Sequence, residues 1–180
     1  METILTWMEN SALGELVRGA GVWSYGLINL VHILGIASLF GAVLILDLRL
    51  LGWRRHIALA TVASITMPIA LAGFAVAALS GVSLLATNAT EYIGNPFLLI
   101  KFVALPCALI NALLLGRTSV WRVFIRESEH KDSLASKLLQ RGHNTREPEP
   151  HEQRVLAAFG AVSLLCWLIV VGAGRMIGYW

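Results

Sequence analysis

The stretch LINLVHILGIASLFGAVLILDLRLLGW, residues 27–53, decides what kind of protein this is. No Lys, Arg, Asp or Glu occurs in residues 25–46, and uncharged apolar runs of about 18 residues or more are typical of membrane-spanning helices. The run nevertheless contains a histidine, His32, and it ends at Asp47-Leu48-Arg49. Polar side chains at membrane depth are costly, so each of them needs a physical reason.

The composition of the whole chain supports a membrane location. Of its 180 residues, 57% are hydrophobic and 14% are charged, whereas about a quarter of the residues in soluble domains are charged. The mean hydropathy is +0.70. Loops near a membrane explain the net charge of +3, so we expect no nucleic-acid partner. The sequence predicts an integral membrane protein whose main contact is the lipid bilayer.

The apolar runs predict an all-α fold, an antiparallel bundle of four transmembrane helices in a single domain, residues 1–180. An apolar stripe in residues 1–20 favours a helix lying on the outer membrane surface. Residues 116–154 are predicted to form a cytoplasmic loop with a short amphipathic helix at 132–141. Pro68 predicts a kink in the second span. The four predicted spans are residues 25–46, 57–86, 97–115 and 155–177.

The basic residues predict the orientation. Eleven of the 14 Lys and Arg residues lie in the loops after the first and third spans, and such loops are normally cytoplasmic. Arg18, Lys101 and Arg175 belong to the opposite side. We therefore expect a multi-pass protein of a bacterial inner membrane with both termini in the periplasm.

Small residues predict the faces on which the helices pack. Residues four apart that are small allow helix backbones to approach closely in a membrane. The expected contact faces are Gly73, Ala77 and Gly81 in the second span, Ala37 and Gly41 in the first, and Gly160, Ser163, Trp167 and Gly174 in the fourth.

Three side chains that can carry positive charge converge on the outer half of the predicted bundle. His32 lies about 10 Å below the outer end of the first span, Lys101 is near the start of the third, and Arg175 is near the end of the fourth. Each charge at membrane depth costs about 2.5–3.5 kcal/mol, which favours a shared anionic or electron-rich ligand. The structural alternative is that Lys101 and Arg175 reach the membrane surface while His32 caps a carbonyl.

Two further polar residues lie in the spans. Asp47 shares a helix face with His32, about 22 Å away along the axis, and we expect it to pair with arginines at the inner rim. Asn111 is expected to hold helices together. If haem binds, His32 would be its axial ligand, with Lys101, Met176 or Met67 as sixth ligand. Copper could instead use His32 with Met176 or a cysteine.

Three segments resemble a bacterial four-helix membrane family known as a domain of unknown function: HILGIASLFGAVLILDLRLLG, YIGNPFLLIKF and WLIVVGAGRMIGYW. More remotely, the layout resembles the copper-resistance D family and the HemJ-type protoporphyrinogen oxidases. In the HemJ type, haem b binding depends on a histidine, a Gly-Leu-x-x-x-x-Arg-Leu-like stretch and a lysine in the third span. The matching positions are His32, residues 41–50 and Lys101; a further histidine of that family is replaced by Asn111-Ala112.

Our leading hypothesis is a haem-b-binding redox protein that exchanges electrons with a quinone or a periplasmic partner. His32 would be the axial ligand, and Lys101 and Arg175 would pair with the propionates or supply a sixth ligand. Whether the protein is an enzyme, a membrane oxidoreductase, stays open. The alternatives are copper or small-solute transport dependent on His32 and Asp47, and a non-catalytic subunit that anchors a periplasmic partner. A homo-oligomer or a larger complex is compatible with each hypothesis.

Overall fold

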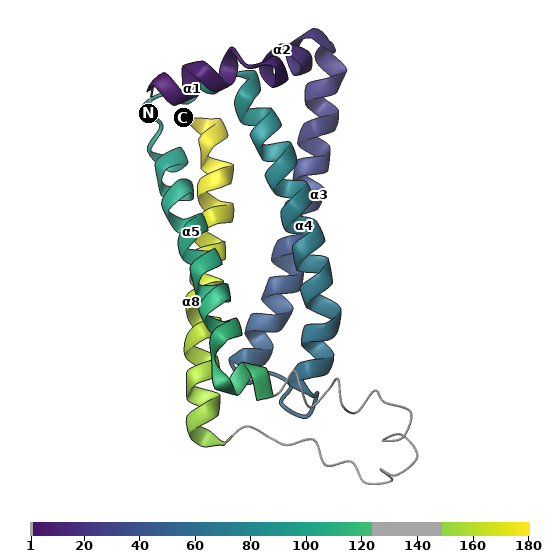
Figure 1. The fold of residues 1–180 in the computed structure, drawn as a ribbon, viewed down its shortest axis with the longest axis vertical. Helices are drawn as coiled ribbons and strands as arrows, with labels where there is room; N and C mark the ends of the chain where they lie inside the picture. The colour runs from purple at the N-terminus through teal and green to yellow at the C-terminus, as the bar shows by residue number, and fades with distance from the viewer. Residues whose placement is uncertain (1, 124–148) are drawn as a thin grey trace. The chain divides into compact units, whose positions relative to one another are not determined.

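The computed structural model of the chain describes residues 2–123 and 149–180, which are helical apart from short connections (Figure 1). Four of the described helices are long and apolar enough to cross a membrane, which confirms the predicted all-α fold with four spans. The amphipathic helix predicted for 132–141 lies outside the described residues. The elements are α1 (Glu2–Glu9), α2 (Ala12–Gly19), α3 (Val22–Leu50), α4 (Leu59–Thr87), η1 (Ala89–Tyr92), α5 (Pro96–Arg117), α8 (Pro150–Met176) and η2 (Ile177–Tyr179).

The chain divides into two compact units, and each of the four long helices contributes a part to both. Unit 1 consists of Met1–Gly41, Ile69–Phe102 and Ile169–Trp180, whereas unit 2 consists of Ala42–Pro68 and Val103–Leu168. Pro68 lies inside α4, where the helix passes from unit 2 into unit 1. The helix continues through it, as helices in membranes can when neighbouring groups satisfy the freed carbonyl.

In unit 1, the N-terminal segment forms two helices rather than the single one predicted. Ser11 ends the first and caps the second, because its hydroxyl oxygen accepts a hydrogen bond from the backbone N–H of Gly14 at 3.3 Å. Ser is among the best residues at this position because it satisfies a backbone donor that the helix leaves unpaired. Figure 1 shows α1 and α2 lying across the end of α4.

Arg18 ties this N-terminal segment to the end of α4. Its Nη1 donates to the backbone oxygen of Thr87 at 3.0 Å, and its Nη2 donates to the backbone oxygen of Glu9 at 2.7 Å. The last carbonyls of a helix lack partners within the helix and carry partial negative charge, so a guanidinium is well suited to them. The Glu9 carboxylate in turn accepts from the backbone N–H of Thr90 at 2.7 Å. These hydrogen bonds from Thr90 hold the pKa of Glu9 below its ordinary value.

The backbones of α3 and α4 touch in unit 1. A Cβ atom added to Gly35 would lie 2.7 Å from the backbone nitrogen of Ala77, and one added to Gly73 would lie 2.6 Å from that of Leu39. Side chains larger than hydrogen are excluded at both glycines, which is the arrangement that small residues permit in membranes. The predicted packing face of the second span is therefore confirmed.

The predicted face of the first span was wrong. Gly41 has no neighbouring atom within 4 Å of the position where its Cβ would be, and Ala37 is exposed. The residues of α3 that meet α4 are Gly35 and Leu39 instead. Two residues correspond to a rotation of about 200° around a helix, so Ala37 and Gly41 point away from this contact.

The start of α5 is set by the sequence Gly94-Asn95-Pro96. Gly94 has a φ of 84°, a conformation that glycine adopts without strain. The side-chain oxygen of Asn95 accepts from the backbone N–H groups of Phe97 and Leu98 at 2.9 and 3.3 Å, and Pro96 takes the first helical position, which it favours. The Asn95 amide also donates to the carbonyl of Ile177 at 3.4 Å, which links α5 to η2.

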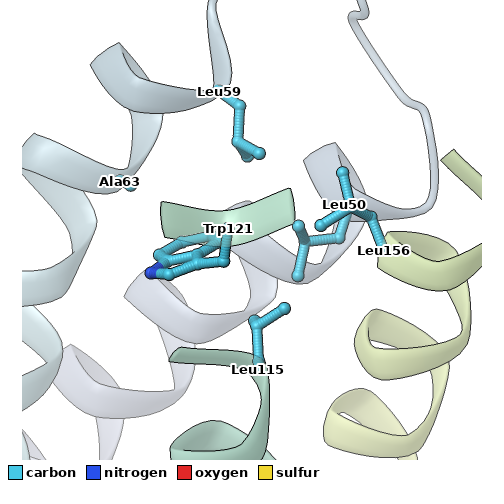
Figure 2. Close-up of a cluster of buried hydrophobic side chains, with 6 residues drawn as sticks. All are labelled: Leu50, Leu59, Ala63, Leu115, Trp121 and Leu156. Atoms are coloured by element: carbon cyan, nitrogen blue, oxygen red, sulfur yellow. The ribbon is translucent and has the colours of Figure 1, made fainter. Parts of the chain in front are cut away.

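Unit 2 is built around a cluster of buried apolar side chains (Figure 2). The cluster draws residues from all four long helices, close to where α3 and α5 end and where α4 and α8 begin. The indole of Trp121 lies among the leucines. Its members are Leu50, Leu59, Ala63, Leu115, Trp121 and Leu156.

Candidate functional site

His32 lies on α3 and faces the serine Ser80 of α4 in unit 1. Its Nδ1 lies 3.0 Å from the Ser80 hydroxyl oxygen, and this hydroxyl donates to the carbonyl of Val76 at 2.5 Å. A hydroxyl has a single proton, so a Ser80 hydroxyl that donates to Val76 accepts from a proton on His32 Nδ1. The ring also hydrogen-bonds to the backbone of Ala77. In the tautomer with its proton on Nδ1, the Nε2 atom keeps a lone pair, which is the form in which histidine binds metals.

Gly81 completes the surroundings of this ring. A Cβ atom at Gly81 would lie 2.9 Å from Cε1 of His32 and 3.7 Å from its Nε2. The imidazole edge thus rests against the backbone of α4, and any side chain at this position would push the ring away from Ser80.

Lys101 is in the second turn of α5, and its side chain lies over Gly174 of α8. A Cβ atom at Gly174 would be 3.6 Å from the Lys101 ammonium nitrogen. Lys101 is half-buried and acts electrostatically on His32. In the described part of the chain, it has no hydrogen-bond or ion-pair partner. Lys101 thus lies near enough to His32 for its charge to act on the ring, and no counter-charge among the described residues faces the ammonium.

Arg175 makes a different set of contacts. It donates to the hydroxyl of Tyr179, one helical turn away, and its guanidinium carbon lies 4.7 Å from the centroid of that ring. Among the described contacts, none joins Arg175 to His32 or Lys101. Met176 is 43% exposed at the same end of α8. The role of both residues in a cofactor site remains a prediction.

Asp47 is the most deeply buried ionisable residue of the described spans, with 2% of its surface exposed. Its backbone packs against Gly160 of α8, and the Ser163 side chain hydrogen-bonds to the carboxyl group. The second carboxyl oxygen, Oδ2, is buried and has no hydrogen-bond partner among residues 2–123 and 149–180. Burying such an oxygen without a partner is costly.

The expected ion pair between Asp47 and arginines is not what the described residues form. Arg49 donates from Nε to the carbonyl of Ile57 at 2.8 Å and from Nη2 to that of Arg55 at 3.1 Å. It thereby closes the connection between α3 and α4. Backbone carbonyls need hydrogen-bond donors, and the Arg49 guanidinium supplies them for these two carbonyls.

Asn111 connects two helices of unit 2, as its amide donates to the Phe159 carbonyl of α8 at 3.1 Å. Cys107 and Cys166, on α5 and α8, act electrostatically on each other and form no disulfide. No group of three or more His, Cys, Asp or Glu side chains that could hold a metal ion exists among the described residues. A haem iron needs only one or two protein ligands, so a single histidine such as His32 is compatible with it.

Sequence reasoning did not identify Ser80 and Gly81 as partners of His32. Both lie seven or fewer residues from the end of α4, at about the depth of His32 on α3. Matching the depth of polar residues on neighbouring spans could have found the serine. The rotation of α4 that turns Ser80 toward His32 depends on which residues of α3 meet Gly73. No local pattern in the sequence identifies Gly35 and Leu39 as those residues.

No protein-family model, curated protein or solved structure matches this chain.

Proposed function

We propose that this chain is a redox protein of the membrane that binds haem b through His32. The observation that carries the proposal is the hydrogen bond between His32 Nδ1 and Ser80, which favours the tautomer whose Nε2 can act as a ligand. Histidines that bind metals typically donate their other ring N–H to a fixed oxygen, and this bond sets the orientation of the ring. Gly81 keeps the ring edge free of a competing side chain.

The unpaired ammonium of Lys101 supports the same proposal. A half-buried cation at membrane depth favours an anionic ligand, and haem supplies two carboxylates in its propionates. Lys101 would hold one of these carboxylates while His32 binds the iron. Bound haem supplies one-electron chemistry to the site.

The partners follow from the location. Basic loops after the first and third spans favour a bacterial inner membrane with periplasmic termini, and unit 1 contains the C-terminal end. A quinone in the membrane or a periplasmic redox protein would then be the electron donor or acceptor. The redox partners and the orientation in the membrane are both part of this proposal.

The test is an absorption spectrum of the full chain. The protein is expressed with added haem precursor, purified in mild detergent, and recorded in oxidised and reduced form. We expect a Soret band and a reduced-minus-oxidised difference spectrum typical of haem b. His32→Ala should lose at least nine-tenths of the bound haem, and Lys101→Met should retain haem with lower occupancy.

His56 offers a matched control, because it is exposed and lies in the connection between α3 and α4, in unit 2. His56→Ala should bind haem like the unchanged protein. Absence of a Soret band in haem-replete material, or equal occupancy in His32→Ala and His56→Ala, contradicts the proposal. Elemental analysis of the same preparation detects copper, which would favour the copper alternative.

A further inference from the structure

A layer of buried polar side chains crosses unit 2, with one residue from each long helix. Asp47, Thr66, Asn111 and Ser163 come from α3, α4, α5 and α8, and each has less than a tenth of its surface exposed. The cluster of Figure 2, in the same unit, consists of apolar side chains. Burying polar side chains in a membrane costs free energy unless their polar atoms have hydrogen-bond partners or a bound ligand.

The four residues occupy similar levels relative to the apolar cluster. Asp47 precedes Leu50 by one helical turn, Thr66 follows Ala63 by one turn, and Asn111 precedes Leu115 by one turn. Ser163 is about two turns beyond Leu156, so each of the four lies one to two helical turns from a member of the cluster on its own helix.

Three of them also meet at a single turn of α8. Asn111 donates to the Phe159 carbonyl, the backbone of Asp47 packs on Gly160, and Ser163 hydrogen-bonds to the Asp47 carboxyl group. The shared turn, residues 159–163, therefore contacts both Asn111 and Asp47, and its Ser163 side chain reaches the carboxyl group.

The Asp47 carboxyl group lacks a counter-charge within this layer. Its Oδ2 has no partner, and Ser163 is the one side chain of the described residues that acts on the carboxyl group. An ionised carboxylate without a counter-charge is very unfavourable in such surroundings, whereas a bound cation removes the penalty. The remaining charged or titratable side chains of unit 2 in the described ranges are Arg49, Arg54, Arg55, His56, Cys107, Arg117, Arg122, Glu149, His151, Glu152, Arg154 and Cys166.

We propose that Asp47, with Ser163, Asn111 and Thr66, forms a buried binding site for one small monovalent cation, either a proton or a sodium ion. One carboxylate balances one positive charge, and hard cations prefer carboxylate, hydroxyl and carbonyl oxygens. The Thr66 hydroxyl donates to the Val62 carbonyl at 2.9 Å and keeps its lone pairs for a ligand. This site involves no residue of the haem proposal and stands independently of it.

The experiment measures both cations on the full chain in detergent. Binding of radiolabelled sodium is followed by equilibrium dialysis in choline buffer, and infrared spectroscopy follows the carbonyl stretch of a protonated carboxyl group as the pH changes. We expect either saturable binding of one sodium ion or a protonated-carboxyl band that titrates. The first result identifies sodium as the occupant, and the second identifies the proton.

Asp47→Asn should abolish whichever signal is found, whereas Glu91→Gln, which removes an exposed carboxylate of unit 1, should leave it unchanged. Ser163→Ala keeps the charge and should weaken sodium binding about tenfold or move the midpoint of the band. If Asp47→Asn does not fold, the test rests on Ser163→Ala, whose weaker sodium binding or shifted band supports the site. Absence of both signals from the unchanged protein, or signals that both variants preserve, overturns the proposal.

Discussion

Unit 1 and unit 2 each enclose one residue whose charge has no partner, and the two charges have opposite sign. Unit 1 contains the half-buried ammonium of Lys101, whose charge acts on a histidine that is hydrogen-bonded to Ser80. Unit 2 contains the carboxyl group of Asp47, which is more deeply buried and interacts only with a neutral hydroxyl among the described side chains. The same four helices thus favour an anionic ligand in one unit and a cation in the other.

The two units also differ in how their helices are held. In unit 1, α3 and α4 meet through the glycines Gly35 and Gly73, which bring backbone against backbone. In unit 2, leucines from four helices and Trp121 fill the space between them (Figure 2). Backbone contact tolerates no added atom, whereas a leucine cluster tolerates loss of volume at a graded cost. Substitutions should therefore affect the two units in different ways.

The largest effect is expected for Gly73→Leu. The new side chain would begin 2.6 Å from the backbone nitrogen of Leu39, so α3 and α4 must separate and His32 must leave Ser80. We expect a loss of about 4 kcal/mol or more, enough to prevent accumulation of folded protein. The measurement is unfolding by SDS in mixed micelles, followed by circular dichroism.

Gly41→Leu is the matched substitution, because no atom lies within 4 Å of its Cβ position. It adds the same side chain to the same pair of helices and should change the free energy of unfolding by less than about 1 kcal/mol. Equal destabilisation by the two variants would show that the glycine contact does not hold unit 1 together.

The main features of the fold could be predicted from composition and local pattern. Uncharged apolar runs located all four spans. Gly-Asn-Pro at residues 94–96 is a local signal that could also have placed the start of α5, since each residue suits its backbone position. Counting residues from the ends of the spans also brought His32 and Lys101 to one level. These inferences depend only on length and helical rise.

The rest depends on how the helices are rotated against one another, which the sequence does not reveal locally. Ala37 and Gly41 form a better small-residue pattern than Gly35 and Leu39, yet Gly35 and Leu39 are the residues that meet α4. The inner rim is rich in arginines, and Asp47 was expected to pair with them, yet Arg49 of this rim hydrogen-bonds to backbone carbonyls. The uncapped carbonyls of the following turn compete for the same guanidinium, and their position appears only in the folded chain.

A moderate effect is expected when the leucine cluster of unit 2 is reduced. Leu156→Ala removes a side chain that is 1% exposed and leaves a cavity that its neighbours fill only in part. We expect unfolding to become easier by about 2–3 kcal/mol. Leu165→Ala, on the same helix but 61% exposed, should cost much less, and a similar cost for both would mean that the cluster is not a packed core.

The smallest effect concerns the N-terminal segment of unit 1 and its dependence on pH. Because the pKa of Glu9 is lower in the folded chain than in the unfolded one, its contribution is present above the ordinary pKa of the carboxyl group. That contribution disappears as the pH falls through the folded pKa, when protonation weakens the bond from the Thr90 N–H. Hydrogen exchange should therefore show lower protection of the Thr90 amide in acid, and Glu9→Gln should show a reduced protection that is independent of pH in this range. Glu15→Gln, also in the N-terminal segment, should keep the acid dependence; if Glu9→Gln keeps it too, the docking of α1 does not rely on this carboxylate.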